Sequence, residues 1–264
     1  MRFARGDRLF ERLAGTSRGR SAAAERSGDG VAPALWRTRR HGAETWEELD
    51  HAGDQTWLRG RTGGLAREAL QQALLFPATR LVARPTIRGA DDLYSTPQPA
   101  VIAANHSSDL DTPLILSALP RPWRTRTLVG AAEDRFYRRR RYAISTELWI
   151  GTFAFDRGAE GRGLAQAATL LREGMNVLLY PQGTRSHGLG GFRAGVARLA
   201  VACDVPIVPV HVGGTALLMP KDRGLTQRGR CTVTFGPPLH PDPAEEPRDF
   251  AARLSAAIAR LALP

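Results

Sequence analysis

The amino-acid sequence predicts an α/β domain with a central, largely parallel or mixed sheet flanked by helices. From residue 85 onward, short runs rich in β-branched and other apolar residues alternate with helical patterns. Such interleaving is typical of a sheet that carries helices on its faces. The chain has 264 residues, of which 42% are hydrophobic and 24% charged. These values allow one large domain with additional segments and exclude fibrous and wholly disordered proteins.

The first 55 residues predict no packed structure. They are rich in glycine, serine and arginine and show no sustained period of 2 or 3.6 that could bury one face. We therefore expect a disordered extension over residues 1–55. The N-terminus also lacks the apolar core of a secretory signal, so the chain is expected to stay in the cytoplasm.

An amphipathic helical segment is predicted over residues 56–84. Leucines and alanines recur at helical intervals from Leu65 to Leu81, with polar residues between them. Pro77 is expected to kink or split this helix, because proline lacks the amide hydrogen that a helix interior requires. The simpler interpretation is a helix packed on the domain, and the alternative is a helix lying on a lipid surface.

The rest of the chain supplies the elements of the sheet and its helical layers. Seven β-rich runs are predicted as strands: Thr86–Arg88, Ala100–Ala104, Thr125–Val129, Thr152–Phe155, Val177–Tyr180, Ile207–Val212 and Thr232–Phe235. Five helices are predicted over 113–119, 134–146, 163–173, 192–203 and 248–262. In the last of these, Phe250, Leu254 and Ile258 share one stripe, which is typical of a helix docked on a sheet.

Charge and cysteine content limit the classes of protein that remain. The longest charge-free runs, Leu93–Ser108 and Val205–Pro220, contain prolines and polar residues, so no membrane-spanning helix is predicted. Only Cys203 and Cys231 are present, which excludes a disulfide framework or a zinc cluster. The net charge of +11 favours an anionic partner or substrate.

The stretch from Val101 to Pro113 carries the strongest candidates for catalysis. It predicts a buried strand that runs into a polar turn containing His106 and Asp111, at the sheet edge where α/β proteins place ligands. A carboxylate on one imidazole nitrogen fixes the tautomer and leaves the other nitrogen to accept a proton from a hydroxyl. The pair therefore predicts a general base and its orienting group.

Two other interpretations of this turn stay open. The histidine could be an ordinary polar turn residue and Asp111 a helix cap. In the general-base interpretation, the helix that follows has Thr112 as its N-cap and Pro113 as its first helical residue. A metal site built from Asp109 and Asp111 is a weaker alternative, because the sequence offers no spacing that completes a ligand set.

A second polar turn follows the strand that ends at Tyr180. Its sequence is Pro-Gln-Gly-Thr-Arg, in which Gly183 permits close approach of the backbone and Arg185 offers five donors. Glycine amides together with a guanidinium form a phosphate-sized anion pocket. The alternative is a solvated glycine turn with a surface arginine.

Two further segments end or form β-like runs. Phe153–Arg157 again ends in an arginine, and Val205–Val210 predicts a buried strand in which Pro209 limits backbone pairing.

The order and spacing of these segments resemble the four blocks of the glycerolipid acyltransferases, the family of 1-acyl-glycerol-3-phosphate acyltransferase. The matching positions are Asn105-His106-(four residues)-Asp111, Phe155-Asp-Arg157, Tyr180-Pro-Gln-Gly-Thr-Arg185 and Val205-Pro-Ile-Val-Pro209. The resemblance extends from about Pro85 to Pro238 and implies an acyltransferase domain over 85–264. It includes Phe192–Gly195, where Arg193 replaces the family's lysine.

This resemblance implies a reaction and a set of roles. His106 would deprotonate the hydroxyl of a lysophospholipid such as 1-acyl-glycerol-3-phosphate, and Asp111 would orient the imidazole. The acyl group would come from acyl-CoA or an acyl-carrier protein, with no metal and no other cofactor. The acceptor's phosphate would be held by Arg157, Gly183, Thr184 and Arg185. Further motif positions are Asn105, Gln182, Arg193 and Pro209.

One position departs from the family pattern. The third block of the family has glutamate where this chain has Gln182, which keeps the size, loses the charge and gains two donors. We therefore hypothesise a different acceptor, such as another hydroxylated lipid or a specialised metabolite.

The densest positive charge lies between the first two blocks. Arg121–Arg141 holds 8 arginines and only two acidic residues, with aromatic residues such as Trp123 among them. This pattern could contact an anionic membrane at the inner face, an acidic carrier protein or the phosphates of CoA, or it could be a solvated face over core aromatics. A non-catalytic basic protein that binds membrane or nucleic acid is the rival from another class. No nucleic-acid-binding module is recognisable, so no such partner is expected.

Overall fold

The computed structural model describes residues 60–132, 140–156, 162–185, 191–221, 223–242 and 245–263. For residues 61 and 140–144 only the backbone is described. All of these residues belong to one compact unit, Gln55–Pro264. The extension predicted over 1–55 and the candidate Arg157 lie outside the described residues.

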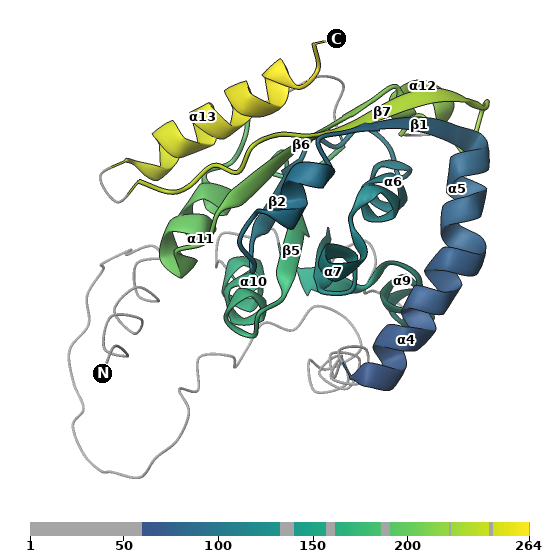
Figure 1. Ribbon diagram of the computed structural model, residues 1–264, viewed down its shortest axis with the longest axis horizontal. Coiled ribbons are helices and arrows are strands. Elements are labelled where there is room, and N and C mark those ends of the chain that lie inside the picture. Colours follow the sequence, from purple (N-terminus) through teal and green to yellow (C-terminus); the bar gives the residue numbers. More distant parts are fainter. Residues whose placement is uncertain are drawn as a thin grey trace, which may run out of the picture. The chain divides into compact units, whose positions relative to one another are not determined.

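A seven-stranded mixed sheet forms the centre of the fold (Figure 1). Its strands are β1 (Ala83–Arg88), β2 (Val101–Ala104), β3 (Thr127–Ala132), β4 (Thr152–Phe155), β5 (Asn176–Leu179), β6 (Ile207–Gly213) and β7 (Gly229–Phe235). They are arranged in the order β1-β7-β6-β2-β5-β3-β4, and all neighbours are parallel except β6 and β7. The predicted α/β fold is confirmed. All seven predicted strands are present, β4 with the predicted bounds and the other six with shifted ends.

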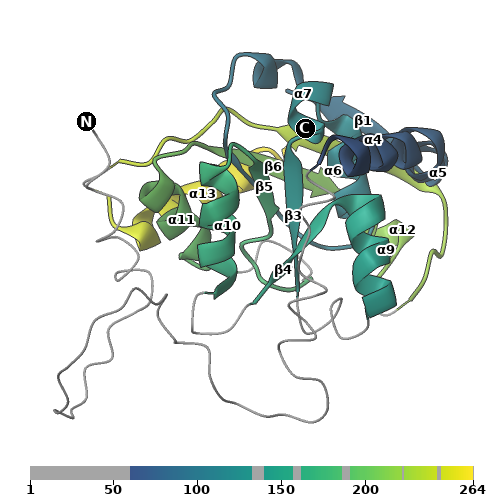
Figure 2. The ribbon, with the colours of Figure 1, turned by 90° about the horizontal axis from the view of Figure 1, so that it is seen from below.

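Helices cover both faces of this sheet. They are α4 (Arg61–Leu70), the π-helical turn η1 (Gln71–Leu75), α5 (Phe76–Val82), the 3₁₀ turn η2 (Asp91–Tyr94), α6 (Asp111–Ala118), α7 (Arg121–Arg124), α9 (Arg140–Ile150), α10 (Arg162–Arg172), α11 (Gly195–Cys203), α12 (Thr215–Leu218) and α13 (Pro247–Arg260). Figure 2 shows α10, α11 and α13 on one side of the sheet and α4, α5, α6 and α9 on the other.

The core has two halves because side chains of a strand point alternately to opposite faces. In β2, Ile102 and Ala104 belong to the half beneath α6, together with Trp123. Val101 and Ala103 belong to the half beneath α10, α11 and α13. Each of these residues is buried, so β2 is covered on both faces, as expected of a central parallel strand.

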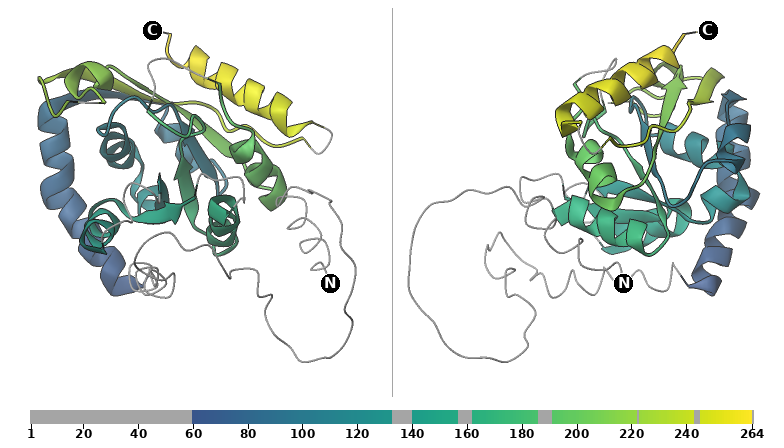
Figure 3. Two further views of the ribbon diagram at one scale, coloured as in Figure 1. Left: turned by 180° about the vertical axis from the view of Figure 1, so that it is seen from behind. Right: turned by 60° about the vertical axis from the view of Figure 1, so that its left-hand side comes forward.

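The N-terminal helices α4, η1 and α5 run as one unit beside the sheet (Figure 3). The π-helical turn immediately precedes Phe76 and Pro77, and so accommodates the proline without ending the helix. The buried face of the unit holds Arg67, Gln71 and Phe76, which agrees with the predicted packing on the domain. The outer face exposes Leu65, Leu74 and Leu81.

The basic stretch that begins at Arg121 is described only in part. In that part, Trp123 is buried in the core and its indole Nε1 donates a hydrogen bond to the carbonyl of Leu93 at 2.8 Å. Trp123 is therefore a core aromatic, as the alternative of a solvated face over core aromatics expects, and is not available to a membrane surface. Arg121 is exposed and forms an ion pair with Glu68. Through the described parts of the chain, no helix has the length and apolar character needed to cross a bilayer.

Candidate active site

Three neighbouring parallel strands bring the candidate residues to one edge of the sheet. Strands β6, β2 and β5 lie side by side and point the same way, so the segments that follow them meet at their carboxyl ends. Strand β2 leads into the turn with His106, and β5 leads into the turn with Arg185. Strand β6 leads into the short helix α12, which begins at Thr215. Three segments that are well separated in the chain therefore form one site.

His106 and Asp111 are in direct contact. The imidazole Nδ1 lies 3.0 Å from Oδ2 of Asp111, whose side chain is fully buried, while the imidazole is 18% exposed and lines a cavity. With its proton on Nδ1, the imidazole donates a hydrogen bond to the carboxylate, and Nε2 is then the nitrogen able to accept a proton. This geometry is what the general-base hypothesis requires.

Asp111 has a complete set of hydrogen-bond donors. Besides the imidazole, Oδ2 accepts the backbone N–H groups of Ser107 at 2.7 Å and Ser108 at 2.8 Å, and Oδ1 accepts the hydroxyl of Thr215 at 2.6 Å. These four bonds compensate the loss of water around a buried carboxylate. Thr215 lies 104 residues further along the chain, and sequence reasoning missed it because no local pattern connects the two positions.

The predicted cap of helix α6 is wrong. The helix begins at Asp111 with Leu110 as its N-cap, and no side chain caps it. Thr112 therefore lies inside the first turn, and its hydroxyl contacts the hydroxyl of Tyr180 at 2.6 Å. The carboxylate of Asp111 bonds the amides of the preceding turn, a local arrangement that competes with regular capping.

Tyr180 packs on the face of the catalytic candidate. Its ring lies 4.1 Å from the imidazole of His106 between centroids, with the two planes 19° apart. Burial, together with the carboxylates of Asp111 and Asp109, raises the pKa of the Tyr180 phenol, so the neutral form is favoured. In strand β6, burial lowers the pKa of His211, whose Nδ1 has no hydrogen-bond partner among the described residues.

Asn105 and Gln182 fix the backbone on either side of the general-base candidate. Asn105 exchanges two hydrogen bonds with the backbone of Val212, at 2.9 Å and 2.7 Å, and so joins the end of β2 to β6. The side-chain Oε1 of Gln182 accepts the backbone N–H of His106 at 2.8 Å. An amide oxygen accepts this hydrogen bond as a carboxylate oxygen would.

The turn after β5 supplies the anion-binding candidates. Gly183 has a φ of +72°, which favours glycine, and an added Cβ would lie 3.2 Å from the guanidinium carbon of Arg193. Thr184 is exposed, whereas Arg185 is only 10% exposed and its Nη1 lies 2.8 Å from Oδ2 of Asp109. The predicted phosphate-binding arginine therefore pairs with a carboxylate of the histidine's own turn.

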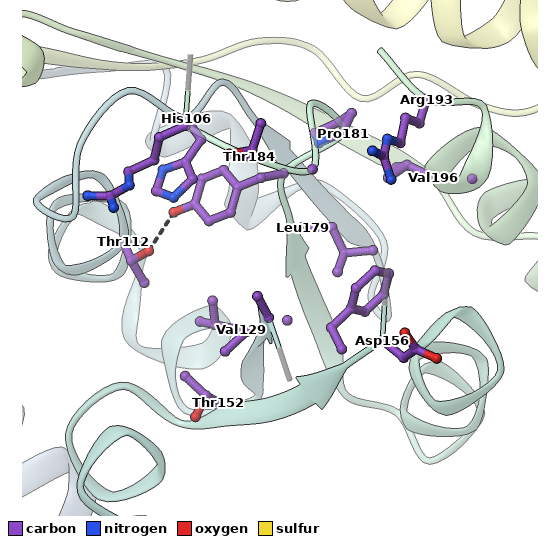
Figure 4. A pocket seen from close by; sticks show the side chains of 18 of the residues that line it. His106, Thr112, Val129, Thr152, Asp156, Leu179, Pro181, Thr184, Arg193 and Val196 are labelled. Carbon is purple, nitrogen blue, oxygen red and sulfur yellow. Dashed lines mark hydrogen bonds between the residues drawn. The ribbon is translucent and has the colours of Figure 1, made fainter. Parts of the chain in front are cut away.

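A cavity of about 1230 Å³ connects these groups (Figure 4). His106, Thr112 and Thr184 lie at one end, and Val129 and Thr152 lie at the other. Its deeper wall is mostly apolar and includes Leu75, Val129, Ile150, Phe155, Leu164 and Leu179. Positively charged side chains also line it, namely Arg185, Arg193, Arg198, Lys221 and Arg248. The cavity thus combines an apolar interior with a basic rim.

One motif position lies elsewhere. Pro209 is buried within β6 and is not among the lining residues of this cavity in the described structure. Proline has no backbone N–H to donate. Pro209 lies where the hydrogen bonds between β6 and the chain that follows β7 are interrupted, between the bridge of Ile207 to Leu239 and the pairing of Val210 with Phe235. Within the described residues, no group of three or more His, Cys, Asp or Glu side chains is placed to hold a metal ion.

Comparison with known proteins gives a consistent relationship. The family model named Acyltransferase matches residues 84–213, which contain both polar turns. The chain is 31% identical over 167 residues to 1-acyl-sn-glycerol-3-phosphate acyltransferase alpha of Mus musculus, covering 59% of this chain and 55% of that protein. The Ovis aries protein of the same name is 31% identical over 180 residues, covering 64% and 58%. Residues 84–213 therefore form an acyltransferase domain that is similar to the 1-acyl-sn-glycerol-3-phosphate acyltransferases.

The fold comparison agrees with this assignment. The crystal structure of the 1-acyl-sn-glycerophosphate acyltransferase PlsC from Thermotoga maritima superimposes with a TM-score of 0.56 over 80% of this chain and 92% of that one, at 20% identity. At this identity the likeness concerns the fold alone. The family resemblance drawn from the four sequence blocks is confirmed. The match to the mouse and sheep relatives spans little more than half of their lengths.

Proposed function

We propose that this protein transfers a fatty acyl group from an acyl thioester to the hydroxyl of 1-acyl-glycerol-3-phosphate. The single observation that carries the proposal is the contact of His106 with the buried Asp111 at the mouth of a cavity that also holds Arg185. A base, an anion-binding group and an apolar chamber are the three features that such a transfer needs. The acceptor class is suggested by the relatives, which are 1-acyl-sn-glycerol-3-phosphate acyltransferases.

The reaction follows from the geometry of the imidazole. Nε2 of His106 takes the proton of the acceptor hydroxyl as the oxygen attacks the thioester carbonyl, and Asp111 stabilises the imidazolium that forms. The tetrahedral intermediate then collapses, the carbon–sulfur bond breaks and the imidazolium returns its proton to the departing thiolate. An ester and a free thiol result, with no covalent acyl-enzyme.

The acceptor is held by its phosphate. Arg185 presents a planar guanidinium suited to phosphate oxygens, and the backbone of Gly183 allows close approach. Arg193, which replaces the family's lysine, lies against Gly183 and adds positive charge to the same corner. Thr184 and Arg157 complete the proposed phosphate-binding set, the latter from outside the described residues.

The acyl chain of the thioester occupies the apolar interior of the cavity. A volume of about 1230 Å³ exceeds that of ordinary small-ligand pockets and is lined by leucine, valine, isoleucine and phenylalanine side chains. The donor is acyl-CoA or an acyl-carrier protein, and both carry phosphate toward the basic rim. No metal or further cofactor takes part in the proposed step.

We also propose peripheral attachment to an anionic membrane at its cytoplasmic face. The exposed Leu65, Leu74 and Leu81 lie on the helical unit α4–η1–α5, and Leu75 of the same unit lines the cavity. Leucines on an interfacial helix bury in the headgroup region, and basic residues add attraction to anionic lipid. Lipid substrates would then reach the cavity from the membrane.

Substitution of the base tests the proposed function. General-base catalysis contributes about 10² to 10⁴ in rate, so His106→Ala is expected to lower turnover by that factor without unfolding the domain. The measurement is thiol release from acyl-CoA in the presence of 1-acyl-glycerol-3-phosphate, with product identified by mass spectrometry. Unchanged turnover of a folded His106→Ala protein would refute the proposal.

A panel of hydroxylated acceptors tests the alternative that Gln182 raised. The same assay is run with lysophospholipids of other head groups and with monoacylglycerol. Preference for an acceptor other than 1-acyl-glycerol-3-phosphate would support that alternative. Thiol release with none of them would support the rival of a non-catalytic binding protein.

A further inference from the structure

Tyr180 stacks on the imidazole of the proposed base, and the mechanism above gives this residue no role. Its ring lies 4.1 Å from that of His106, almost parallel to it, and both residues line the cavity. The tyrosine comes from the end of β5 and the histidine from the end of the neighbouring strand β2. The contact is therefore set by the sheet and does not depend on a single loop.

One hydrogen bond is insufficient to fix an imidazole. The bond from Nδ1 to Asp111 holds one atom of the ring, but the ring can still tilt and pivot about that atom. A flat aromatic surface against one face of the ring restrains the remaining motion, because tilting would break the parallel contact. Nε2 would then keep its direction toward the cavity.

Tyr180 is itself held in place by helix α6. Its hydroxyl lies 2.6 Å from the hydroxyl of Thr112, as the dashed line in Figure 4 shows. Thr112 follows Asp111 directly in the first turn of α6. Two consecutive residues of one helix thus restrain the histidine, Asp111 through a hydrogen bond and Thr112 through the tyrosine ring.

The hydroxyl of the phenol is directed at helix α6. It is engaged with Thr112, and burial beside carboxylates raises the pKa of Tyr180, which keeps the phenol neutral. The ring face is what the tyrosine offers to the site.

We propose that Tyr180 is a positioning residue that aligns the imidazole of His106 through its ring face, with Thr112 anchoring the ring. The proposal rests on the general-base function of His106 given above. It assigns the tyrosine hydroxyl a secondary role, as the group that fixes the ring against α6.

Three substitutions separate the ring from the hydroxyl. Tyr180→Leu removes the flat face and is expected to lower kcat by about 10- to 100-fold, because small misplacements of a catalytic group cost rate of this size. Tyr180→Phe keeps the ring and should retain most of the kcat of the unaltered protein. Thr112→Val should behave like Tyr180→Phe. The KM values for donor and acceptor should stay near those of the unaltered protein, because Tyr180 acts through His106 on the chemical step.

A matched control and a second variant support the measurement. Tyr94→Leu makes the same exchange at a tyrosine that is 71% exposed on η2, and should leave kcat unchanged. Each variant is checked for cooperative thermal unfolding. If Tyr180→Leu fails to fold, Tyr180→Met replaces it, since methionine fills irregular space without offering a flat face.

A spectroscopic readout tests alignment independently of turnover. Long-range proton–nitrogen spectra of protein labelled in histidine report which ring nitrogen of His106 carries the proton, with His106→Ala used for assignment. One sharp set of signals with protonated Nδ1 is expected for the unaltered protein and for Tyr180→Phe. Broadened or mixed signals are expected for Tyr180→Leu.

Several outcomes would overturn the proposal. They are retention of kcat by folded Tyr180→Leu, an equal loss in Tyr180→Leu and Tyr180→Phe, and an imidazole spectrum that Tyr180→Leu leaves unchanged. Failure of the proposed function looks different. In that case His106→Ala itself retains turnover, and the spectra still show whether the tyrosine aligns the ring.

Discussion

The two sides of the cavity are built in different ways. On the base side, His106 and Asp111 are joined by a hydrogen bond, and the carboxylate has four donors in a fully buried setting. On the anion-binding side, Arg185 forms an ion pair with Asp109, and Arg193 is exposed. The difference indicates that the proposed base is preorganised for one geometry, whereas the rim proposed to bind the anion has fewer fixed contacts among the described residues.

This contrast predicts two kinds of kinetic defect. Changes on the base side should lower kcat, because they disturb a group that acts in the transition state. Changes on the rim should raise KM for an anionic substrate, because they weaken binding that is similar in the ground and transition states.

The largest effect is expected from Asp111→Asn. The amide keeps the size of the carboxylate but lacks the negative charge that stabilises an imidazolium. Its oxygen can still accept the backbone N–H groups of Ser107 and Ser108, whereas its nitrogen would face the Thr215 hydroxyl that now donates to Oδ1. We expect kcat to fall by about 100-fold or more. Steady-state kinetics of thiol release measure this fall, and circular dichroism verifies the fold.

The matched control for this change is Asp109→Asn. It removes the same charge two positions earlier, at the rim, where it frees Arg185 from its ion pair. The expected effect is a change in KM for the phosphate-bearing acceptor with kcat largely retained. Equal loss of kcat in both variants would show that the two sides do not differ in the way described.

The second largest effect is expected from Arg185→Lys. Lysine keeps the positive charge but loses the planar fork that binds two phosphate oxygens at once. We expect kcat/KM for 1-acyl-glycerol-3-phosphate to fall by about tenfold. Loss of one charge-assisted hydrogen bond costs about 1.5 kcal/mol or more, and about 1.4 kcal/mol corresponds to a factor of ten in rate. Monoacylglycerol, which lacks the phosphate, should be unaffected as an acceptor. An equal loss with both acceptors would argue against a phosphate contact.

A smaller effect is expected at Thr215, the buried donor to Asp111. Thr215→Val has the same shape but leaves Oδ1 of Asp111 without its hydroxyl partner, which costs about 1 to 3 kcal/mol of unfolding free energy. We expect kcat to fall by about tenfold as well, because 1.4 kcal/mol of lost orientation corresponds to that factor. Thr215→Ser should restore both quantities. Urea unfolding and kinetics measure them, and a valine variant with full stability would contradict the assigned bond.

The fold was predictable because its signals are local. The alternation of strands and helices follows from short-range periodicity, and the stripe of Phe250, Leu254 and Ile258 in α13 is buried as its spacing indicates. The start of α6 was not predictable in detail. The carboxylate of Asp111 accepts hydrogen bonds from the amides of the preceding turn, and the helix begins at Asp111 instead of after a cap at Thr112.

The site was predictable only where residues are close in sequence or share a family motif. His106 and Asp111 are five residues apart, and the structure places them in contact. Three other contacts of the site join positions that are 74 to 104 residues apart: Thr215 to Asp111, Tyr180 to His106 and Asp109 to Arg185. They depend on the strand order β6-β2-β5. No periodic pattern encodes that order, so these partners had no signal in the sequence.

The smallest effect is expected from Gln182→Glu, which restores the residue of the family pattern. The side chain accepts a hydrogen bond from the backbone N–H of His106, and a carboxylate oxygen can do the same. The fold should therefore stay the same, and the maximal kcat should change by less than about threefold. A carboxylate at this position would favour the imidazolium, which is the form unable to accept a proton. The acid limb of the pH profile of kcat/KM should therefore move to higher pH.

The same variant decides whether Gln182 changes acceptor choice. Rates with a panel of lysophospholipids are compared between the unaltered protein and Gln182→Glu. If Gln182 acts only through its bond to the His106 backbone, the order of preference stays the same and only the pH profile moves. A new order of preference would instead place the side chain in contact with the acceptor, and would make position 182 part of the anion-binding side rather than the base side.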